Sequence, residues 1–245
     1  MQTHASTQVH TPGRPAATEP EAAYSFKVRG YDLYEKEGLK DEDHPLLPYH
    51  VTEPCIRRVW TGADQLAPAF TAAAAPGQPV PAFTAAAAPG QLAAASTVLT
   101  GSDCPGVSFS GRLIGGCLDI LCMLAGTRFD HVKEFNARFG DDGIIWFLEA
   151  CDLNVMSIRR ALWQLDQAGW FSHVRGFLIG RPLNGEALFG LDRFEAVTGI
   201  LKKYNVPILM DLDIGHIPPM MPLIEGSLAD VKMCGNDLTI EMRLV

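Results

Sequence analysis

The chain has 245 residues, 47% of them hydrophobic, and its 20 Lys and Arg against 28 Asp and Glu give a formal net charge of −8. This acidic balance argues against binding to nucleic acid or to an anionic membrane, because either partner requires a basic face. No apolar run reaches the length of a membrane span, and the N-terminus lacks the apolar segment of a secretory signal. We therefore expect a cytoplasmic protein with neither nucleic acid nor membrane as a partner.

The N-terminal part of the chain divides by composition into three segments. Residues 1–23 are rich in Thr, Pro, Ala and Gln without a hydrophobic period, which predicts a disordered tail. Residues 24–60 are dense in charge but hold many aromatic side chains, and we expect this short segment to pack on the main domain. Residues 61–106 are Ala- and Pro-rich and contain PAFTAAAAPGQ at both 68–78 and 81–91, a 13-residue repeat that we interpret as an expanded linker.

From residue 107 to 245 the pattern becomes that of an α/β domain with helices flanking a small sheet. Short apolar, β-branched runs predict strands at 112–114, 143–148, 174–179, 206–212 and 238–244. A helix is predicted from about Val155, with apolar residues on one face, and Gly169 follows it where a C′ glycine belongs. A second helix is predicted over 191–204.

The six cysteines are scattered along the chain and form no CxxC pair. They stand at positions 55, 104, 117, 122, 151 and 234, with no spacing to His that is typical of a zinc site. We therefore expect free thiols, as in a reducing compartment, and neither a metal site nor a cofactor.

Two polar residues follow predicted strands where ligands gather in open α/β sheets, beyond the carboxyl ends. Glu149 comes directly after strand 143–148, and His216 lies in the loop after strand 206–212, beside Gly215 and before two prolines. Each alone is more typical of a structural role, as a solvent-facing strand end or an exposed histidine. Together they suggest two members of a nucleophile–His–carboxylate triad, lying close at the ends of adjacent strands, with the nucleophile still missing.

Several ordered sequence words carry a family resemblance. They are GRLIGGCLD at 111–119, IWFLE at 145–149, SIRRALWQL at 157–165, GFLIGR at 176–181 and Gly215-His216 followed by PLI at 222–224. In content and order these words resemble the C-terminal half of the LD-carboxypeptidases, the serine peptidases that include murein tetrapeptide carboxypeptidase and the microcin C self-immunity proteins.

The resemblance implies a fold, a site and a substrate class. The expected fold is α/β, a small mixed sheet with flanking helices like the family's C-terminal, swivelling β/β/α-like domain. Glu149 and His216 would be the catalytic Glu and His, and Gly115, Gly116 and Cys117 would border the substrate pocket. Cys117 stands where many members have Asn, although a free cysteine such as Cys117 or Cys151 is more often a small buried apolar residue.

The implied partners are a small peptide or muropeptide substrate, a second copy of the chain in a homodimer, and a separate serine-containing N-terminal domain. In the family the nucleophile sits in that N-terminal domain, in a Gly-x-Ser-Asp turn at a helix start. The segment TGSD at 100–103 lacks the residue between Gly and Ser, and the CPG that follows does not permit a helix, so we do not expect Ser102 to be the nucleophile.

The residues and the resemblance together leave two candidate functions. The first is a serine-type LD-carboxypeptidase that cleaves an L,D-amide in a muropeptide or a peptidyl-nucleotide amide, with Glu and His present but the nucleophile domain missing, so that this chain alone is inactive. The alternative is a truncated or degenerate member of the family that binds a ligand or partner without turnover.

Overall fold

The computed structural model describes residues 24–35, 42–62, 67–68, 97–99 and 106–244. The predicted tail at 1–23, Ser102 and nearly all of the 13-residue repeat lie outside these described residues. Within the described part, none of the helices is long and apolar enough to cross a membrane.

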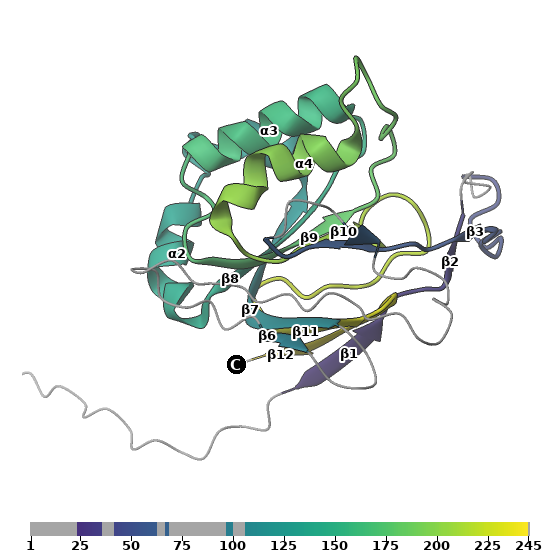
Figure 1. Cartoon of the computed structure of the whole chain (residues 1–245), viewed down its shortest axis with the longest axis horizontal. Helices are drawn as coiled ribbons and strands as arrows, with labels where there is room; N and C mark the ends of the chain where they lie inside the picture. Colours follow the sequence, from purple (N-terminus) through teal and green to yellow (C-terminus); the bar gives the residue numbers. More distant parts are fainter. Residues whose placement is uncertain (1–23, 36–41, 63–66, 69–96, 100–105, 245) are drawn as a thin grey trace, which may run out of the picture.

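A mixed sheet with four α-helices forms the described part of the chain, which confirms the α/β fold class (Figure 1). The strands are β1 Ser25–Arg29, β2 Leu33–Tyr34, β3 Glu53–Pro54, β4 Arg58–Trp60, β5 Ala67–Pro68, β6 Thr97–Leu99, β7 Gly106–Cys117, β8 Ile144–Glu149, β9 Val174–Gly180, β10 Ile208–Leu212, β11 Leu228–Cys234 and β12 Asp237–Arg243. The helices are α1 Leu118–Leu124, α2 Val132–Phe139, α3 Val155–Gln167 and α4 Arg193–Leu201, with short 3₁₀ turns at Gly140–Asp142 and Lys202–Tyr204.

The main sheet has a parallel centre and antiparallel flanks. Its strand order is β1-β12-β11-β7-β8-β9-β10-β4-β5, with β6 paired to β7, while β2 and β3 form a separate ribbon. The neighbours β7, β8, β9 and β10 run parallel to one another. Their carboxyl ends therefore meet at one edge of the sheet, where ligands gather in open α/β folds.

The segment 24–60 contributes strands to both flanks of this sheet. β1 pairs antiparallel with β12 along five residues, from Ser25 opposite Arg243 to Arg29 opposite Thr239. β4 pairs antiparallel with β10 on the other flank. Because β10 leads into the loop that carries His216, the segment lies against the part of the sheet that presents this residue.

Helix α3 has the start and end that its sequence predicts. The side chain of Asn154 accepts a hydrogen bond from the backbone N–H of Ser157 at 3.1 Å, which caps the first turn. Gly169 follows the helix with φ of +78°, and the N–H of Trp170 reaches back to the carbonyl of Leu165 at 3.1 Å. This is the glycine C-terminal motif that the sequence indicates.

Apolar side chains cover both faces of the central strands. In β8, Trp146 belongs to the core under the helices, where its ring stacks on Trp170 with centroids 5.6 Å apart. The neighbouring Ile145 points into a second core on the opposite face. A strand buried on both faces is typical of a parallel sheet, and it gives Glu149, the last residue of β8, a rigid support.

The expectation of free thiols is confirmed for four described cysteines and wrong for a fifth. Cys55, Cys117, Cys122 and Cys151 are free, whereas Cys234 at the end of β11 is disulfide-bonded. Spacing along the sequence does not show which cysteines the fold makes neighbours, and this accounts for the error.

Candidate active site

Glu149 and His216 lie together at the carboxyl edge of the parallel strands. The Nδ1 atom of His216 is 3.0 Å from Oε2 of Glu149. The glutamate side chain is buried, at 6% exposed, whereas the histidine side chain is 52% exposed. One partner is thus fixed inside the protein and the other presents its ring to the surface.

The expectation that the two residues end adjacent strands is wrong in one respect. β9 lies between β8, which carries Glu149, and β10, which precedes His216. The loop after β10 crosses the end of β9 at Gly180, where a Cβ atom would lie 2.1 Å from the carbonyl oxygen of Ile214 and 2.9 Å from the Cβ of Glu149. The glycine therefore leaves the space through which the loop reaches the glutamate.

Gly215 brings the backbone of this loop against the side chain of Glu149. Its φ is +106°, a conformation that L side chains rarely adopt, and a Cβ atom there would lie 2.4 Å from Oε2 of Glu149. Gly215 thus permits a close approach of the backbone to the glutamate side chain. It lets the backbone pass beside the carboxylate so that His216 reaches it from the following position.

A buried charge network anchors the start of the same loop. The carboxylate of Asp213 is fully buried and contacts Arg57 at 2.5 Å and Arg181 at 2.6 Å. It also accepts hydrogen bonds from the backbone N–H of Tyr31 at 2.9 Å and from the thiol of Cys55 at 3.2 Å. Burial raises the pKa of Asp213, but the two guanidinium charges outweigh this and hold its pKa below the ordinary range.

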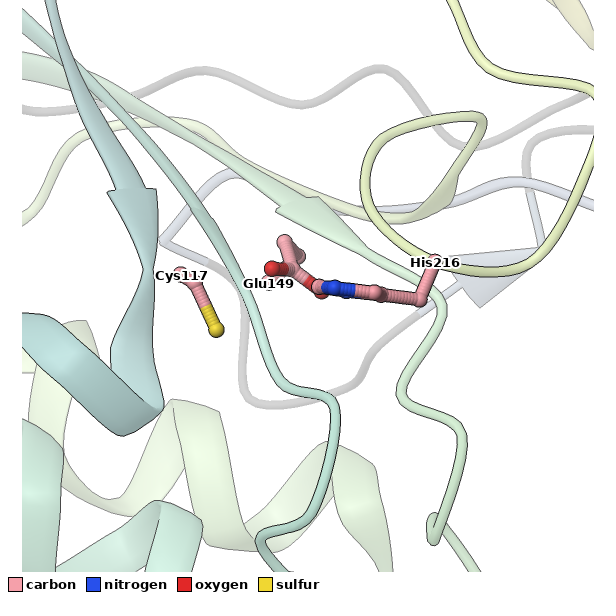
Figure 2. Close-up of side chains that lie close together, drawn as sticks. All are labelled: Cys117, Glu149 and His216. Carbon is pink, nitrogen blue, oxygen red and sulfur yellow. The ribbon is translucent and has the colours of Figure 1, made fainter.

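A third polar side chain stands beside the Glu–His pair. Cys117, the last residue of β7, lies in register with Glu149 on the neighbouring strand β8. Its Sγ atom, one carboxylate oxygen of Glu149 and one ring nitrogen of His216 all lie within 4.8 Å of one another, and Figure 2 shows the three side chains. Burial first, then hydrogen bonding to Glu149, raise the pKa of the Cys117 thiol to about 12.

Asp119 holds the segment that follows Glu149. Its carboxylate accepts hydrogen bonds from the backbone N–H of Cys151 at 3.1 Å and of Asp152 at 2.7 Å, and it lies 3.4 Å from the Sγ of Cys117. Burial raises the pKa of Asp119, but these hydrogen bonds together lower it below the ordinary value. The sequence pattern does not reveal this role, nor that of Asp213, because the partners are distant in sequence and carry no motif.

The predicted pocket residues lie in two different environments. Gly115 lines a cavity of about 450 Å³ together with Trp146, Trp170 and other side chains, and a Cβ atom on it would lie 1.8 Å from the carbonyl oxygen of Phe147. Gly116 has φ of +137° with open space around it. Of the three, Cys117 carries a side chain that reaches the Glu–His pair, and the assignment of all three residues to a substrate pocket stays a prediction.

Comparison with known protein families decides the assignment. Residues 110–231 match the model of the LD-carboxypeptidase C-terminal domain. Through this domain, the chain belongs to the LD-carboxypeptidase family. The match spans the β8, β9 and β10 strands, Glu149 and His216. No curated protein sequence matches the chain.

Solved structures share the fold of this LD-carboxypeptidase chain at low sequence identity. The structure of MccF in complex with glutamyl sulfamoyl guanosine is 15% identical with a TM-score of 0.55, and the match covers 93% of this chain and 52% of that one. An MccF-like protein from Streptococcus pneumoniae in complex with AMP is 18% identical with a TM-score of 0.52, covering 87% and 52%. A muramoyltetrapeptide carboxypeptidase from Oxalobacter formigenes is 23% identical with a TM-score of 0.47, covering 58% and 47%. The chain thus spans about half the length of these structures.

The structure does not test Ser102, the serine weighed as a nucleophile from the sequence. Ser102 lies outside the described residues, and Ser25 lies on β1 at the outer edge of the sheet, with its hydroxyl 3.4 Å from the carboxylate of Glu241. The site of the described residues therefore offers an oriented histidine and its carboxylate.

Proposed function

We propose that this domain supplies the histidine and the carboxylate of a serine-peptidase active site. Its substrate would be an L,D-amide bond in a small muropeptide, or a related peptidyl-nucleotide amide. The observation that carries the proposal is the 3.0 Å contact between Nδ1 of His216 and the buried carboxylate of Glu149. The serine would come from a further domain, in the same protein or in a partner chain. Cytoplasmic location and a homodimer stay predictions.

The geometry assigns each group a role in this chemistry. Glu149 accepts a hydrogen bond from Nδ1–H of His216, which leaves the lone pair of Nε2 free. Nε2 then takes the proton of the serine hydroxyl as its oxygen attacks the amide carbonyl, and Glu149 stabilises the imidazolium that results. The same proton passes to the leaving amine when the tetrahedral intermediate collapses. The half-exposed ring leaves Nε2 accessible to a serine from outside the described residues.

The solved relatives support the substrate class in part. MccF was solved with glutamyl sulfamoyl guanosine, and the MccF-like protein from Streptococcus pneumoniae was solved with AMP. Both ligands contain a nucleoside, so a peptidyl-nucleotide amide is a reasonable first substrate to test on this chain. The muropeptide alternative rests on the name of the family alone.

Complementation with a serine domain tests the proposal. The chain is combined with the serine domain of a family relative, fused or in trans. Release of the amine from a peptidyl-nucleotide amide is measured first, and release of the terminal D-Ala from a murein tetrapeptide second. We expect no release by the chain alone and clear release by the combination. His216→Ala should lower the restored rate about 10²–10⁴-fold, because the nucleophile then lacks its base. Glu149→Gln should also lower it.

Exposed residues of the same types provide matched controls. His131 and Glu134 lie at the start of α2, 4.0 Å apart, with both side chains more than 70% exposed. His131→Ala and Glu134→Gln should leave the restored rate unchanged. Restored cleavage that survives His216→Ala would refute the assigned role of the histidine.

A serine-reactive fluorophosphonate separates the remaining outcomes. The isolated chain should not be labelled, because the pair requires an external serine. Specific labelling of the isolated chain that His216→Ala abolishes would show that the chain holds its own nucleophile. An absence of labelling together with failed complementation would favour the alternative function, a member of the family that binds a ligand or partner without turnover.

A further inference from the structure

Three side chains of different chemistry converge at the carboxyl edge of the sheet. Cys117 ends β7, Glu149 ends β8, and His216 comes from the loop after β10. One ligand atom from each, a sulfur, a carboxylate oxygen and a ring nitrogen, lies within 4.8 Å of the other two. Figure 2 shows the three residues arriving on three separate segments. The serine-peptidase role uses two of these groups and leaves the thiol unexplained.

This donor set matches the ligands of a zinc-class cation. Zinc binds Cys sulfur at about 2.3 Å, His nitrogen at about 2.0–2.1 Å and carboxylate oxygen at about 2.0–2.2 Å, in tetrahedral geometry. Those lengths place two ligand atoms of one ion roughly 3.3–3.6 Å apart. The oxygen of Glu149 and the nitrogen of His216 are 3.0 Å apart and would have to separate by roughly 0.3 Å. The sulfur of Cys117, which lies within 4.8 Å of both, would have to approach them by at most roughly 1 Å.

The charge around the cluster also favours a cation. Glu149 is buried, and the carboxylate of Asp119 lies 3.4 Å from the sulfur of Cys117. Two carboxylates beside one thiol repel a thiolate unless a positive ion neutralises it. Thiolate and imidazole ligands select zinc-like metals over Mg²⁺ or Ca²⁺, which prefer oxygen.

We propose that Cys117, Glu149 and His216 form a binding site for a divalent zinc-class cation. The three side chains supply the protein ligands, and the fourth position opens on the exposed side of His216. Binding releases the thiol proton to solvent, since the sulfur coordinates as thiolate. Asp119 accepts hydrogen bonds from the N–H groups of Cys151 and Asp152 while it contacts the thiol, and it would thereby orient the sulfur.

The same thiol is poorly suited to act as a nucleophile. A reactive cysteine needs an electropositive surrounding that favours its thiolate. The carboxylates of Glu149 and Asp119 lie beside Cys117 and disfavour a bare thiolate. The metal site is therefore the interpretation that the surroundings of the sulfur support.

The cation and the proposed serine-peptidase role compete for the same two residues. While the ion is bound, the imidazole and carboxylate coordinate it and do not act as a base. The metal site does not depend on the proposed function, however, because it is measured by binding to the chain without any serine domain. A negative result for the metal site therefore does not refute the serine-peptidase role, and the reverse also holds.

Cobalt(II) is the direct probe, because a thiolate ligand gives it a charge-transfer band in the near ultraviolet. The full chain, stripped of metal with a chelator and kept reduced, is titrated with Co²⁺ and then with Zn²⁺ in competition. We expect the band to appear with Co²⁺ and to disappear as Zn²⁺ displaces it. Cys117→Ser should abolish the band and weaken Zn²⁺ binding at least about tenfold.

Matched variants separate the site from other ligands on the chain. Cys122→Ser, at another free and partly buried cysteine, should keep the band. His216→Ala should weaken binding, whereas His131→Ala, at an exposed histidine, should not. His216 is half exposed, so its variant should fold even where Cys117→Ser does not.

Three results would overturn the metal site. The first is a wild-type chain that gives no charge-transfer band with Co²⁺. The second is a band that persists in Cys117→Ser, or affinity that His216→Ala leaves unchanged. The third is rapid alkylation of Cys117 at neutral pH that Zn²⁺ does not slow, which would identify a reactive thiolate in place of a metal ligand.

Discussion

The buried carboxylate of Asp213 offers the sharpest test of how the active-site loop is held. Asp213→Asn keeps the shape of the side chain but removes its negative charge. Arg57 and Arg181, whose side chains are 1% and 8% exposed, would then face each other without a counter-charge. The Nε atoms of both arginines already lack a hydrogen-bond partner among the described residues. The two guanidinium groups are therefore short of hydrogen-bond acceptors even before the carboxylate is lost.

The size of the effect follows from the depth of burial. Removing one partner of a buried ion pair costs about 3–5 kcal/mol, because the remaining charge stays desolvated. A typical domain has only about 5–15 kcal/mol of unfolding free energy in total. We therefore expect Asp213→Asn to lower the urea midpoint of unfolding strongly. The slope of the unfolding free energy against urea concentration should change little.

A partly exposed ion pair provides the matched control. Asp230 contacts Arg243 at 2.6 Å, the same distance as that between Asp213 and Arg181, but its side chain is 34% exposed. Asp230→Asn should cost less than about 1 kcal/mol, because solvent screens the pair. Equal losses in the two variants, measured by urea unfolding, would refute the argument that burial sets the size of the effect.

Two further predictions concern the same loop. The two arginines hold the pKa of Asp213 below its ordinary value. The stability advantage of the wild type over Asp213→Asn should therefore be complete above about pH 3.9 and shrink as the pH falls through the lowered pKa. Urea unfolding at a series of pH values measures this advantage, and an advantage that grew with acidity would contradict the assignment. Gly215→Ala should lower the thermal unfolding midpoint more than Gly116→Ala. Both glycines have positive φ, but only at Gly215 would an added Cβ atom press against Glu149. Equal decreases of the midpoint would show that the contact with Glu149 is unimportant.

Sequence periodicity was enough to predict much of the central fold. The strands β8, β9, β10 and β12 begin and end within two residues of the predicted runs, and α3 has its predicted start and its C′ glycine. The strand β11 was missed, although its buried residues Ala229, Val231 and Met233 alternate with more exposed ones. Helices α1 and α2 were also missed. The N-cap residues of both, Cys117 and His131, give no side-chain capping bond and thus no start signal in the sequence.

The site was predictable where its residues end strands, and hidden where long-range contacts build it. Glu149 and His216 each follow an apolar strand, so topology alone brings them to one edge. The order of strands in the sheet was not visible, and the pair proved to be separated by β9. Cys117 was predicted to border the substrate pocket only through the family resemblance, because its register with Glu149 depends on strand pairing that no local pattern shows.

The contacts of Asp213 show that the site depends on residues outside the region that matches the family model. The match covers residues 110–231, which include Asp213 and Arg181 but not Tyr31, Cys55 or Arg57. Three of the four groups that bind the Asp213 carboxylate therefore come from the segment that precedes the matched domain. The same segment contacts the loop again where the N–H of Glu35 donates to the carbonyl of Pro218 at 2.8 Å, two residues beyond His216. The loop that presents the histidine is thus bound on both sides of His216 by the N-terminal segment, and for this reason that segment is part of the scaffold of the active site.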